Sequence, residues 1–523
     1  MLRPSSPPHF WRRCWPFSFV VAASLVLCGC VDQDPAFRRT LSAPVAFEVD
    51  GALVAYDSAG RRFAVLRGGA TGSVAAAVAT SFIDWPHEAP RQGRSGDGKR
   101  LLVMDPADRI LGAVDPATGK ASAWKLPSEF TTLTPGPDGK HAVVWHVNGG
   151  AQASSLVNPA EVGLVDLDAP SLEKDNPRVA TITGLSRPPI RAQISPEIVA
   201  ANGKHRVVWV ESVSMIGIAD FGPSGVRTLV VPLTPPESTV GIVPIKTVTR
   251  VDGATLHLYL IASNSNDVVH LSITVGGDKL GTSIDQLASG KGPTDILLFG
   301  AGTSLRVATL NATSKELAVL DPSSGAGTFV TLEQAATAFV PYTDADQHPW
   351  ALMWLGSANS QWLQLVDLER VDKKKGKAID VLKAELVVRA VVPTKTLFAL
   401  RHSSGVTGLS LLDPASGKLT SFAGTGLVQD MRVQGDSLFV HGRVGGSSAM
   451  SRIELTDLHG SSVNVSPGGD KLLAFGDAGV ALTGLGLGSF RVAVFAAGDL
   501  KEAPTWLEGI FLNGLFDRKE VTP

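Results

Sequence analysis

The chain has 523 residues, a formal net charge of −2 and only 18% charged side chains. This near-neutral balance argues against binding of a nucleic-acid backbone as a main function, because such binding needs clustered lysines and arginines. The 54 glycines and 33 prolines, with short apolar stretches in place of long amphipathic periods, predict an all-β protein.

The first 29 residues have the zones of an export signal. A positive region with three arginines and no acidic residue precedes an apolar run, residues 17–27, that is too short to span a bilayer as a stable helix. All three cysteines, Cys14, Cys28 and Cys30, fall within or directly after this segment. The rest of the protein is therefore expected to be stabilised by burial of apolar side chains, without a disulfide.

The residues that end the apolar run, Leu27-Cys28-Gly29-Cys30, resemble the lipobox of bacterial lipoproteins. The resemblance implies cleavage between Gly29 and Cys30, a diacylglyceryl group on Cys30, and usually a further acyl chain such as palmitate on its new amino terminus. Cys28 departs from the usual Ala, Ser, Thr or Val, but it is small enough for the same protease pocket. Val31 stands where an Asp would retain a proteobacterial lipoprotein in the inner membrane, which favours the outer membrane. An ordinary signal peptide cut elsewhere is the alternative.

A repeated strand follows the export region. Residues 30–43 are polar and contain proline, so we expect a flexible tether between the lipid and the folded body. From residue 44 onward, a turn followed by an apolar strand recurs. The most similar copies are Gly98–Met104, Gly139–Trp145, Gly203–Trp209 and Asp470–Phe475.

A second repeated element is a hairpin of the Asp-Pro-x-x-Gly type. It occurs in Val114–Lys120, Leu320–Gly325 and Leu412–Lys418. In such a turn, proline fixes φ, the aspartate accepts backbone hydrogen bonds and the glycine supplies a positive φ before the next strand. The units repeat about every 40 to 55 residues, a period typical of four-stranded β-propeller blades.

Together the two motifs resemble the quinoprotein/YVTN/WD40-like propellers of bacteria. The resemblance implies a β-propeller of four-stranded antiparallel blades over residues 44–510, with residues 511–523 as a carboxy-terminal tail. Up to about ten hairpin signals are present, but the units near residues 44–95 and 425–510 look short. We therefore expect about seven or eight blades, with the first strand joined to the last blade to close the ring. Two stacked β-domains are the alternative fold.

Motifs that carry chemistry are scarce. No Gly-x-Ser-x-Gly elbow is present, and His87-Glu88-Ala89-Pro90 begins like a zinc-protease helix but lacks the second histidine, so we expect an exposed loop. Asp344, Asp346 and His348 are weak metal candidates, since two carboxylates and an imidazole are too few ligands for calcium or zinc. A turn without an ion is the simpler interpretation, and no cofactor is expected.

Two further segments have plain structural interpretations. Gly484–Gly488 lacks the spacing of a phosphate-binding loop and predicts a tight strand or bulge. Lys373–Lys377 has no interleaved aromatic residues and predicts a solvated hairpin tip.

Histidines and tryptophans are scattered along the predicted strands. Because propeller enzymes often collect their ligands from the inner strands of several blades, a distributed site could escape a search for linear motifs. The tryptophans are expected to pack between blades. The residues concerned are His141, His146, His205, His257, His270, Trp145, Trp209, Trp350, Trp354 and Trp362.

These observations favour a membrane-anchored envelope lipoprotein whose propeller is a binding or scaffold module for a protein or polysaccharide partner, and not for a nucleic acid. A structural part of a larger outer-membrane assembly fits the same features. The alternative is a propeller enzyme of the lactone hydrolase or quinone-dependent dehydrogenase type, with its site at the central channel.

Overall fold

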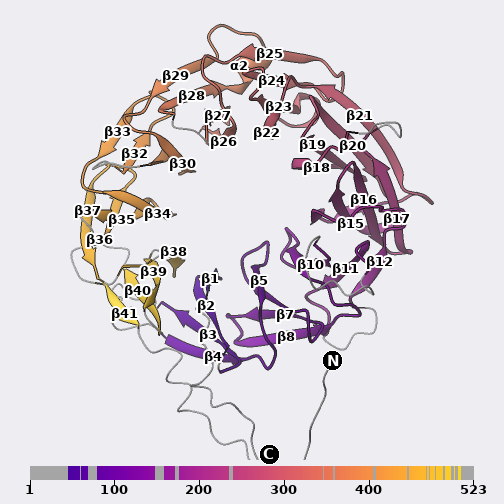
Figure 1. Cartoon of the computed structure of the whole chain (residues 1–523), viewed down its shortest axis with the longest axis horizontal. Helices are drawn as coiled ribbons and strands as arrows, with labels where there is room; N and C mark the ends of the chain where they lie inside the picture. The colour runs from indigo at the N-terminus through magenta and orange to yellow at the C-terminus, as the bar shows by residue number, and fades with distance from the viewer. Residues whose placement is uncertain are drawn as a thin grey trace, which may run out of the picture.

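Ten β-sheets form a closed ring around an open channel in the computed structural model (Figure 1). The structure describes residues 45–507 except 59, 69–78, 148–157, 171–175, 235–239, 345–346, 357–359, 404–407, 445–446, 467, 470, 477–478, 487–488, 496–499 and 501–503. Each sheet is one blade of consecutive strands, and its first strand lies innermost. The signal, tether and tail expected at the two ends of the chain lie outside the described residues.

The first five blades run from the amino-terminal side of the ring. Blade 1 contains β1 (Ala46–Val49), β2 (Ala52–Asp57), β3 (Arg62–Arg67) and β4 (Ala79–Asp84). Blade 2 contains β5 (Arg91–Arg94), β6 (Leu101–Asp105), β7 (Ile110–Asp115) and β8 (Lys120–Lys125). Blade 3 contains β9 (Thr132–Pro135), β10 (His141–Trp145), β11 (Glu161–Asp166) and β12 (Arg178–Thr181). Blade 4 contains β13 (Arg191–Ile194), β14 (Ile198–Ala200), β15 (Gly203–Ser212), β16 (Met215–Gly222) and β17 (Gly225–Pro232). Blade 5 contains β18 (Pro244–Asp252), β19 (Thr255–Ala262), β20 (Asp267–Thr274) and β21 (Gly281–Ala288).

The remaining five blades complete the ring. Blade 6 contains β22 (Pro293–Phe299), a 3₁₀ turn η3 (Gly302–Ser304), β23 (Arg306–Asn311), β24 (Glu316–Leu320) and β25 (Gly327–Thr331). Blade 7 contains β26 (Ala338–Thr343), β27 (Pro349–Trp354), β28 (Trp362–Asp367), the helix α2 (Leu368–Asp372) and β29 (Ile379–Lys383). Blade 8 contains β30 (Val388–Pro393), β31 (Phe398–His402), β32 (Leu409–Leu412) and β33 (Leu419–Phe422). Blade 9 contains β34 (Leu427–Gln434), β35 (Ser437–Val444), β36 (Ser447–Glu454) and β37 (Gly460–Val465). Blade 10 contains β38 (Lys471–Phe475), β39 (Gly479–Gly486), β40 (Ser489–Phe495) and β41 (Thr505–Leu507).

The prediction of a propeller with four-stranded antiparallel blades is confirmed, but the predicted blade number is wrong. The ring has ten blades, where seven or eight were expected. The region at residues 44–95 looked short because β1 has only four residues and reaches β2 through the two-residue turn Asp50-Gly51. The region at residues 425–510, by contrast, has strands of up to eight residues. Residues 427–507 hold two complete blades.

The Asp-Pro hairpins form as their chemistry predicts. In the turn between β7 and β8, Asp115 Oδ1 accepts the N–H of Ala117 at 2.8 Å, and Gly119 adopts a φ of +68°. The same aspartate contact recurs at Asp321 and Asp413. All three hairpins join the third strand of a blade to the fourth, so this motif marks an equivalent place in each of those blades.

The core is divided among the blade interfaces. Ten clusters of buried apolar side chains occur, and each lies between two neighbouring blades. Trp145 and Trp209 belong to two of these clusters, and Trp350 and Trp354 pack against a third. Trp362 instead stays 37% exposed, with Lys383 5.5 Å from its ring centre.

The ring closes by side-to-side packing of blades 1 and 10. Leu53 and Leu66 of blade 1 share a buried cluster with Leu473 and Phe475 of blade 10. Gly476 N–H also donates to the Gly51 carbonyl at 2.8 Å. The expected joining of the first strand to the last blade does not occur, because β38 to β41 already form a four-stranded sheet within the described residues.

The described helical segments are short, and none is long and apolar enough to cross a membrane. The helix α2 was not expected from the sequence. Asp367 Oδ1 caps its amino end by accepting the N–H of Arg370 at 2.9 Å. The lysine-rich segment Lys373–Lys377 directly follows this helix, and two of its members form ion pairs with acidic neighbours.

Candidate functional site: the inner wall of the ring

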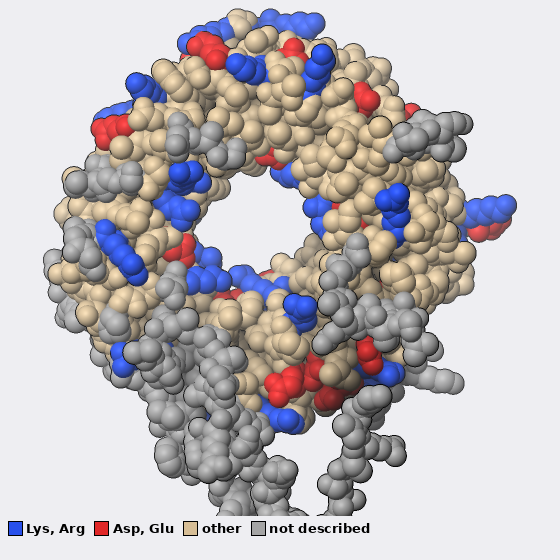
Figure 2. Space-filling model, in the orientation of Figure 1, with Lys and Arg blue, Asp and Glu red and all other residues tan. Residues whose placement is uncertain are grey.

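The innermost strands border the channel, and they carry more cations than acids. The ten strands hold eight lysines and arginines but four acidic residues, whereas the whole chain has a net charge of −2. The cations are Arg91, Arg94, Arg191, Lys246, Arg250, Arg389, Arg432 and Lys471. Figure 2 shows lysine and arginine side chains along the wall of an open channel. The wall therefore differs in charge from the molecule as a whole.

Two of the acids reach across to the next blade. Asp295 follows an irregularity in β22, and its carboxylate accepts the N–H of Phe339 in β26 at 2.8 Å and the ammonium of Lys246 at 2.5 Å. Asp430 follows a similar irregularity in β34 and accepts the N–H of Leu472 in β38 at 2.9 Å. A bulge re-aims the side chain beside it. Both carboxylates thus hold neighbouring blades together.

Glu48 of β1 connects four blades at the point of ring closure. Its carboxylate accepts the N–H of Ala474 in blade 10 at 3.3 Å and lies 3.4 Å from the Arg94 guanidinium of blade 2. The guanidinium of Arg432 in blade 9 also donates to it. Because the Glu48 side chain is only 15% exposed, its charge is partly desolvated. The hydrogen bonds and ion pairs with these partners offset the free-energy cost of that desolvation.

A fully buried carboxylate joins blades 4 and 5 in the same way. Glu211 of β15 accepts hydrogen bonds from Arg191 Nε at 2.9 Å, Gln193 Nε2 at 3.1 Å and Thr247 Oγ1 at 2.8 Å. A buried charge needs such partners. The carboxylates near the inner wall therefore balance the charge of Arg94, Arg191, Lys246 and Arg432, and leave an excess of positive charge on the wall.

The excess gathers on one side of the channel, from blade 8 through blades 9, 10 and 1 to blade 2. We call this surface the basic arc. It comprises Arg389, Arg401, Arg432, Lys471, Arg94 and Arg91. The innermost strands of these five blades contain only two acids, Glu48 and Asp430. Among the described residues, no carboxylate forms an ion pair with Arg91, Arg401 or Lys471.

A pocket of about 420 Å³ opens at one end of the basic arc, between blades 8 and 9. Its lining consists of Arg389, Arg401, His402, Ser403, Leu427, Val428 and Gln429. Arg401 Nη1 donates to the Gln429 carbonyl at 2.9 Å, which fixes one side of the guanidinium against blade 9. Two arginines beside apolar side chains suit a ligand that carries both a negative charge and apolar groups.

His402 does not add a positive charge to this pocket at neutral pH. It is 2% exposed, and its Nε2 lies 2.8 Å from Ser410 Oγ. Burial lowers the pKa of His402, although the nearby carbonyls of Leu386 and Val387 act in the opposite direction. The positive charge of the pocket therefore comes from its arginines.

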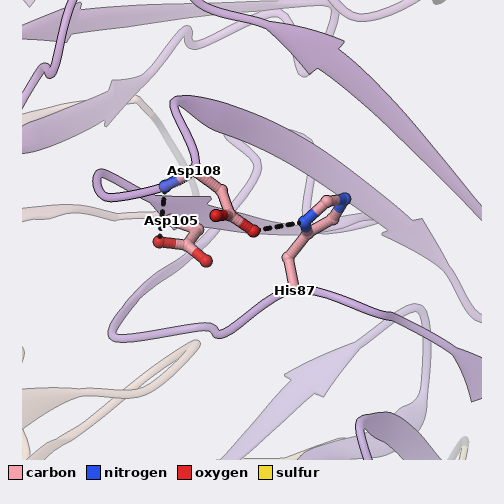
Figure 3. A group of neighbouring side chains, drawn as sticks. All are labelled: His87, Asp105 and Asp108. Atoms are coloured by element: carbon pink, nitrogen blue, oxygen red, sulfur yellow. Dashed lines mark hydrogen bonds and ion pairs between the residues drawn. The ribbon is translucent and has the colours of Figure 1, made fainter.

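A second candidate site is a histidine and two aspartates in blade 2 (Figure 3). The possible ligand atoms of His87, Asp105 and Asp108 lie within 4.8 Å of one another. This is the single group of at least three such side chains among the residues that the structure describes. His87 belongs to the loop before β5, Asp105 is the last residue of β6, and Asp108 lies in the turn between β6 and β7, so the group lies away from the innermost strands.

The contacts in this group account for its carboxylates without an ion. Asp105 accepts the N–H groups of Ala107, Asp108 and Glu88 at 3.1, 3.3 and 3.0 Å, which makes it the cap of the turn. Asp108 Oδ2 lies 2.8 Å from His87 Nδ1. A metal ion such as Zn²⁺ could use these donor types, but it would have to displace the bond between His87 and Asp108.

Neighbouring side chains hold the His87 loop in place. Tyr56 Oη donates to the His87 carbonyl at 2.7 Å, and burial raises the pKa of Tyr56. Trp85 lies 2% exposed against Gly112, where an added Cβ would approach the indole to 2.0 Å. The loop expected from His87-Glu88-Ala89-Pro90 is present, and it is packed by these contacts instead of projecting freely.

The metal candidates proposed from the sequence have other partners. Asp344 accepts the N–H of His348 at 2.8 Å and Trp350 Nε1–H at 3.1 Å. The His348 imidazole lies between Asp367 and Glu369, at 2.8 and 2.9 Å. Asp346 is outside the described residues, as are Leu27, Cys28, Gly29 and Cys30.

The histidines singled out in the sequence lie away from the channel wall. His141, His205, His257 and His270 lie on second or third strands of their blades, and His146 directly follows β10. His205 is buried between Asp220 and Asn202. The structure does not bring these histidines together into one site, although His257 and His270 are neighbours, with 3.0 Å between Nδ1 and Nε2.

Sequence reasoning missed the basic arc and the carboxylates that link blades. The cations of the arc are one or two per strand and belong to four blades, some of them far apart in the chain, so no local cluster reveals them. The signal that was available is an aspartate directly before an apolar strand residue, in Asp295-Ile296 and Asp430-Met431.

Comparisons with known proteins support only a likeness of fold. No protein-family model matches the sequence, and no curated protein matches it. A solved eukaryotic initiation factor is 11% identical, with a TM-score of 0.45, and the match covers 81% of this chain and 96% of that one. The dihydro-heme d1 dehydrogenase NirN is 10% identical, with a TM-score of 0.42 and coverage of 73% and 77%. A putative 6-phosphogluconolactonase from Bacteroides fragilis is 13% identical, with a TM-score of 0.34 and coverage of 70% and 95%. Similarities this weak carry no inference about activity.

Proposed function

We propose that this protein is a lipid-anchored lipoprotein of the bacterial envelope whose ten-bladed propeller is a binding or scaffold module. In this proposal Cys30 carries the lipid, Val31 directs the protein to the outer membrane, and the inner wall of the ring receives a protein or polysaccharide partner. The lipobox resemblance of Leu27-Cys28-Gly29-Cys30 supports the anchor.

The charge of the inner wall is the observation that carries the binding function. The innermost strands hold twice as many cations as acids. Three of the four acids, Glu48, Asp295 and Asp430, bond to neighbouring blades, so the innermost strands carry more lysines and arginines than carboxylates. Keeping like charges close together costs free energy unless a partner of opposite charge offsets it.

A propeller enzyme of the lactone hydrolase or quinone-dependent dehydrogenase type is the alternative. Such an enzyme would need several acid, base or metal-binding side chains at one mouth of the channel. Among the described residues, the group of His87, Asp105 and Asp108 is away from the innermost strands. This placement favours the binding module.

The anchor is tested by replacing Cys30 with Ala in the full chain. The wild-type protein should incorporate radiolabelled palmitate, while Cys30→Ala should not. Cys14→Ala is the matched control and should behave like the wild type. Equal incorporation of palmitate by Cys30→Ala and the wild type would disprove lipidation at this residue.

The binding surface is tested by cross-linking in intact envelopes. The full lipoprotein should form a specific cross-linked complex that is lost in Arg389→Gln/Arg401→Gln. Lys120→Gln/Lys418→Gln removes two exposed lysines at the start of outer strands β8 and β33 and should leave the complex intact. A complex that persists equally in both variants would exclude the inner wall as the binding surface.

A further inference from the structure

We infer that the basic arc binds an acidic polypeptide segment in an extended conformation, supplied by a partner protein of the envelope. This inference rests on the proposed function, in which the inner wall is the binding surface. It adds the chemistry of the partner and the way in which the partner lies on the wall.

The first argument is charge complementarity with a carboxylate-rich chain. Arg389 and Arg401 line one pocket, and its volume of about 420 Å³ is ample for an acidic side chain together with its neighbours. A guanidinium matches a carboxylate with two parallel hydrogen bonds. Because Arg401 also donates to the Gln429 carbonyl, its guanidinium is already oriented, and less side-chain entropy is lost on binding.

The rest of the arc provides further positive groups along the wall. Lys471 begins β38, and Arg91 begins β5, so cations recur from blade to blade around the channel. Both side chains lie on residues that are exposed. A segment with acidic residues at intervals could therefore contact several blades at once.

Aliphatic side chains beside the arginines favour a polypeptide over a polysaccharide. Leu427 of β34 lines the pocket and is 44% exposed. The strongly exposed aromatic side chains among the described residues are Phe329 and Trp362, which lie on β25 and β28, away from the innermost strands. On the innermost strands, the partly buried aromatic side chains pack against the clusters between blades; they are Phe47, Phe299 and Tyr342. The described wall thus offers apolar contact to peptide side chains but no strongly exposed aromatic face for stacking of a sugar ring.

The free edges of the innermost strands favour an extended segment. Each innermost strand stands at the end of its sheet and has one edge without a neighbouring strand. An extended peptide that runs from blade to blade crosses these edges and can meet their unpaired backbone N–H and C=O groups at each crossing. In the arc, β5 and β38 pair without irregularity and present regular edges, whereas Arg389 lies at an irregularity in the pairing of β30 with β31.

The test measures binding of a fluorescein-labelled 12-residue peptide in which Glu alternates with Thr and Val. The full-length lipoprotein in detergent should raise its fluorescence anisotropy in a saturable way at low salt, and added NaCl should weaken binding. Arg389→Gln/Arg401→Gln should weaken the affinity about tenfold. Arg91→Gln/Lys471→Gln removes side chains that form no ion pair with described residues, so it should fold normally and weaken binding about threefold.

Three sets of controls test whether binding depends on the charge of the peptide, whether a polysaccharide can replace the peptide, and whether each variant is folded. The same peptide with Gln in place of Glu should not bind, and Lys120→Gln/Lys418→Gln should bind the acidic peptide as the wild type does. Polygalacturonate, an anionic polysaccharide, should not compete at equal charge concentration. Circular dichroism of each variant confirms that the ring is folded.

Each opposing outcome has a distinct meaning. Arginine-dependent binding of polygalacturonate without binding of the peptide would overturn the inference while leaving the inner wall as a binding surface. Peptide binding that both arc variants leave unchanged would also overturn it. Failure of the proposed function would appear separately, as an envelope complex that does not depend on Arg389 and Arg401.

Discussion

Replacing Glu48 with Gln tests how the ring closes without shared strands. The carboxylate of Glu48 bonds the Ala474 N–H, and it pairs with the guanidinium groups of Arg94 and Arg432, whose side chains are 46% and 37% exposed. Ion pairs this exposed contribute about 0.5 kcal/mol each, and a charge-assisted bond to a backbone N–H contributes about 1 kcal/mol. Because the Gln amide oxygen can still accept the Ala474 N–H, Glu48→Gln removes the two ion pairs and only part of this bond, and it should weaken closure by about 1.4 kcal/mol.

Hydrogen exchange of the Ala474 amide measures this effect where it arises. A loss of about 1.4 kcal/mol corresponds to roughly tenfold faster exchange, if opening of blade 10 from blade 1 exposes the amide. Glu129→Gln is the control, because Glu129 lies 3.7 Å from Arg109 in a pair whose side chains are about half exposed. Equal exchange in the two variants would show that Glu48 does not hold the ring closed and that the apolar contacts between blades 1 and 10 are sufficient.

Three further predictions concern pH, packing and metal ions. Burial lowers the pKa of His257 and of His270, so the unfolded chain takes up protons first and the free energy of unfolding should fall as pH drops below about 6.5. His270→Gln should flatten this dependence in urea titrations between about pH 7 and pH 5, and an unchanged slope would mean that other groups cause it. Gly112→Ala should cost about 1 to 3 kcal/mol in the same assay, because the new methyl group would meet the Trp85 ring; wild-type stability would show that the indole can move aside. EDTA should leave the melting temperature of the wild type and of His87→Ala unchanged, and a fall seen only in the wild type would reveal a bound ion.

The sequence predicted the blade architecture but not the number of blades, and the repeated motifs explain why. The Asp-Pro-x-x-Gly hairpin always joins the third and fourth strands, so it reports a fixed place in the blade. The apolar strand motif does not: Gly98–Met104 leads into the second strand of blade 2, whereas Asp470–Phe475 leads into the first strand of blade 10. If these copies are treated as equivalent, the predicted start of a blade is misplaced by one strand. Two neighbouring blades can then be counted as one.

The basic arc was harder to predict because its residues come together only when the blades are arranged in a ring. Arg91 and Lys471 are 380 positions apart in the sequence, yet they lie on the innermost strands of blades 2 and 10, which are separated by a single blade in the closed ring. Contacts between residues close in sequence could be predicted, as the hydrogen bond from the Ala117 N–H to Asp115 Oδ1 shows. To predict where charges gather around a ring, one must know the number of blades and the position of each strand within its blade. One sequence left both uncertain.

The blade number itself bears on function. Because each blade contributes one innermost strand, ten blades enclose a wider channel than seven or eight of the same build, and Figure 2 shows that side chains do not fill it. Charged groups on these strands then border an open space, and the ion pairs of Glu48 and Asp295 join blades that lie near each other in the ring. The carboxylates of Glu48, Asp295 and Asp430 also accept backbone N–H groups of neighbouring blades. The proposed binding surface depends on the positive charge that is left on the innermost strands, because an acidic external chain would be attracted to it.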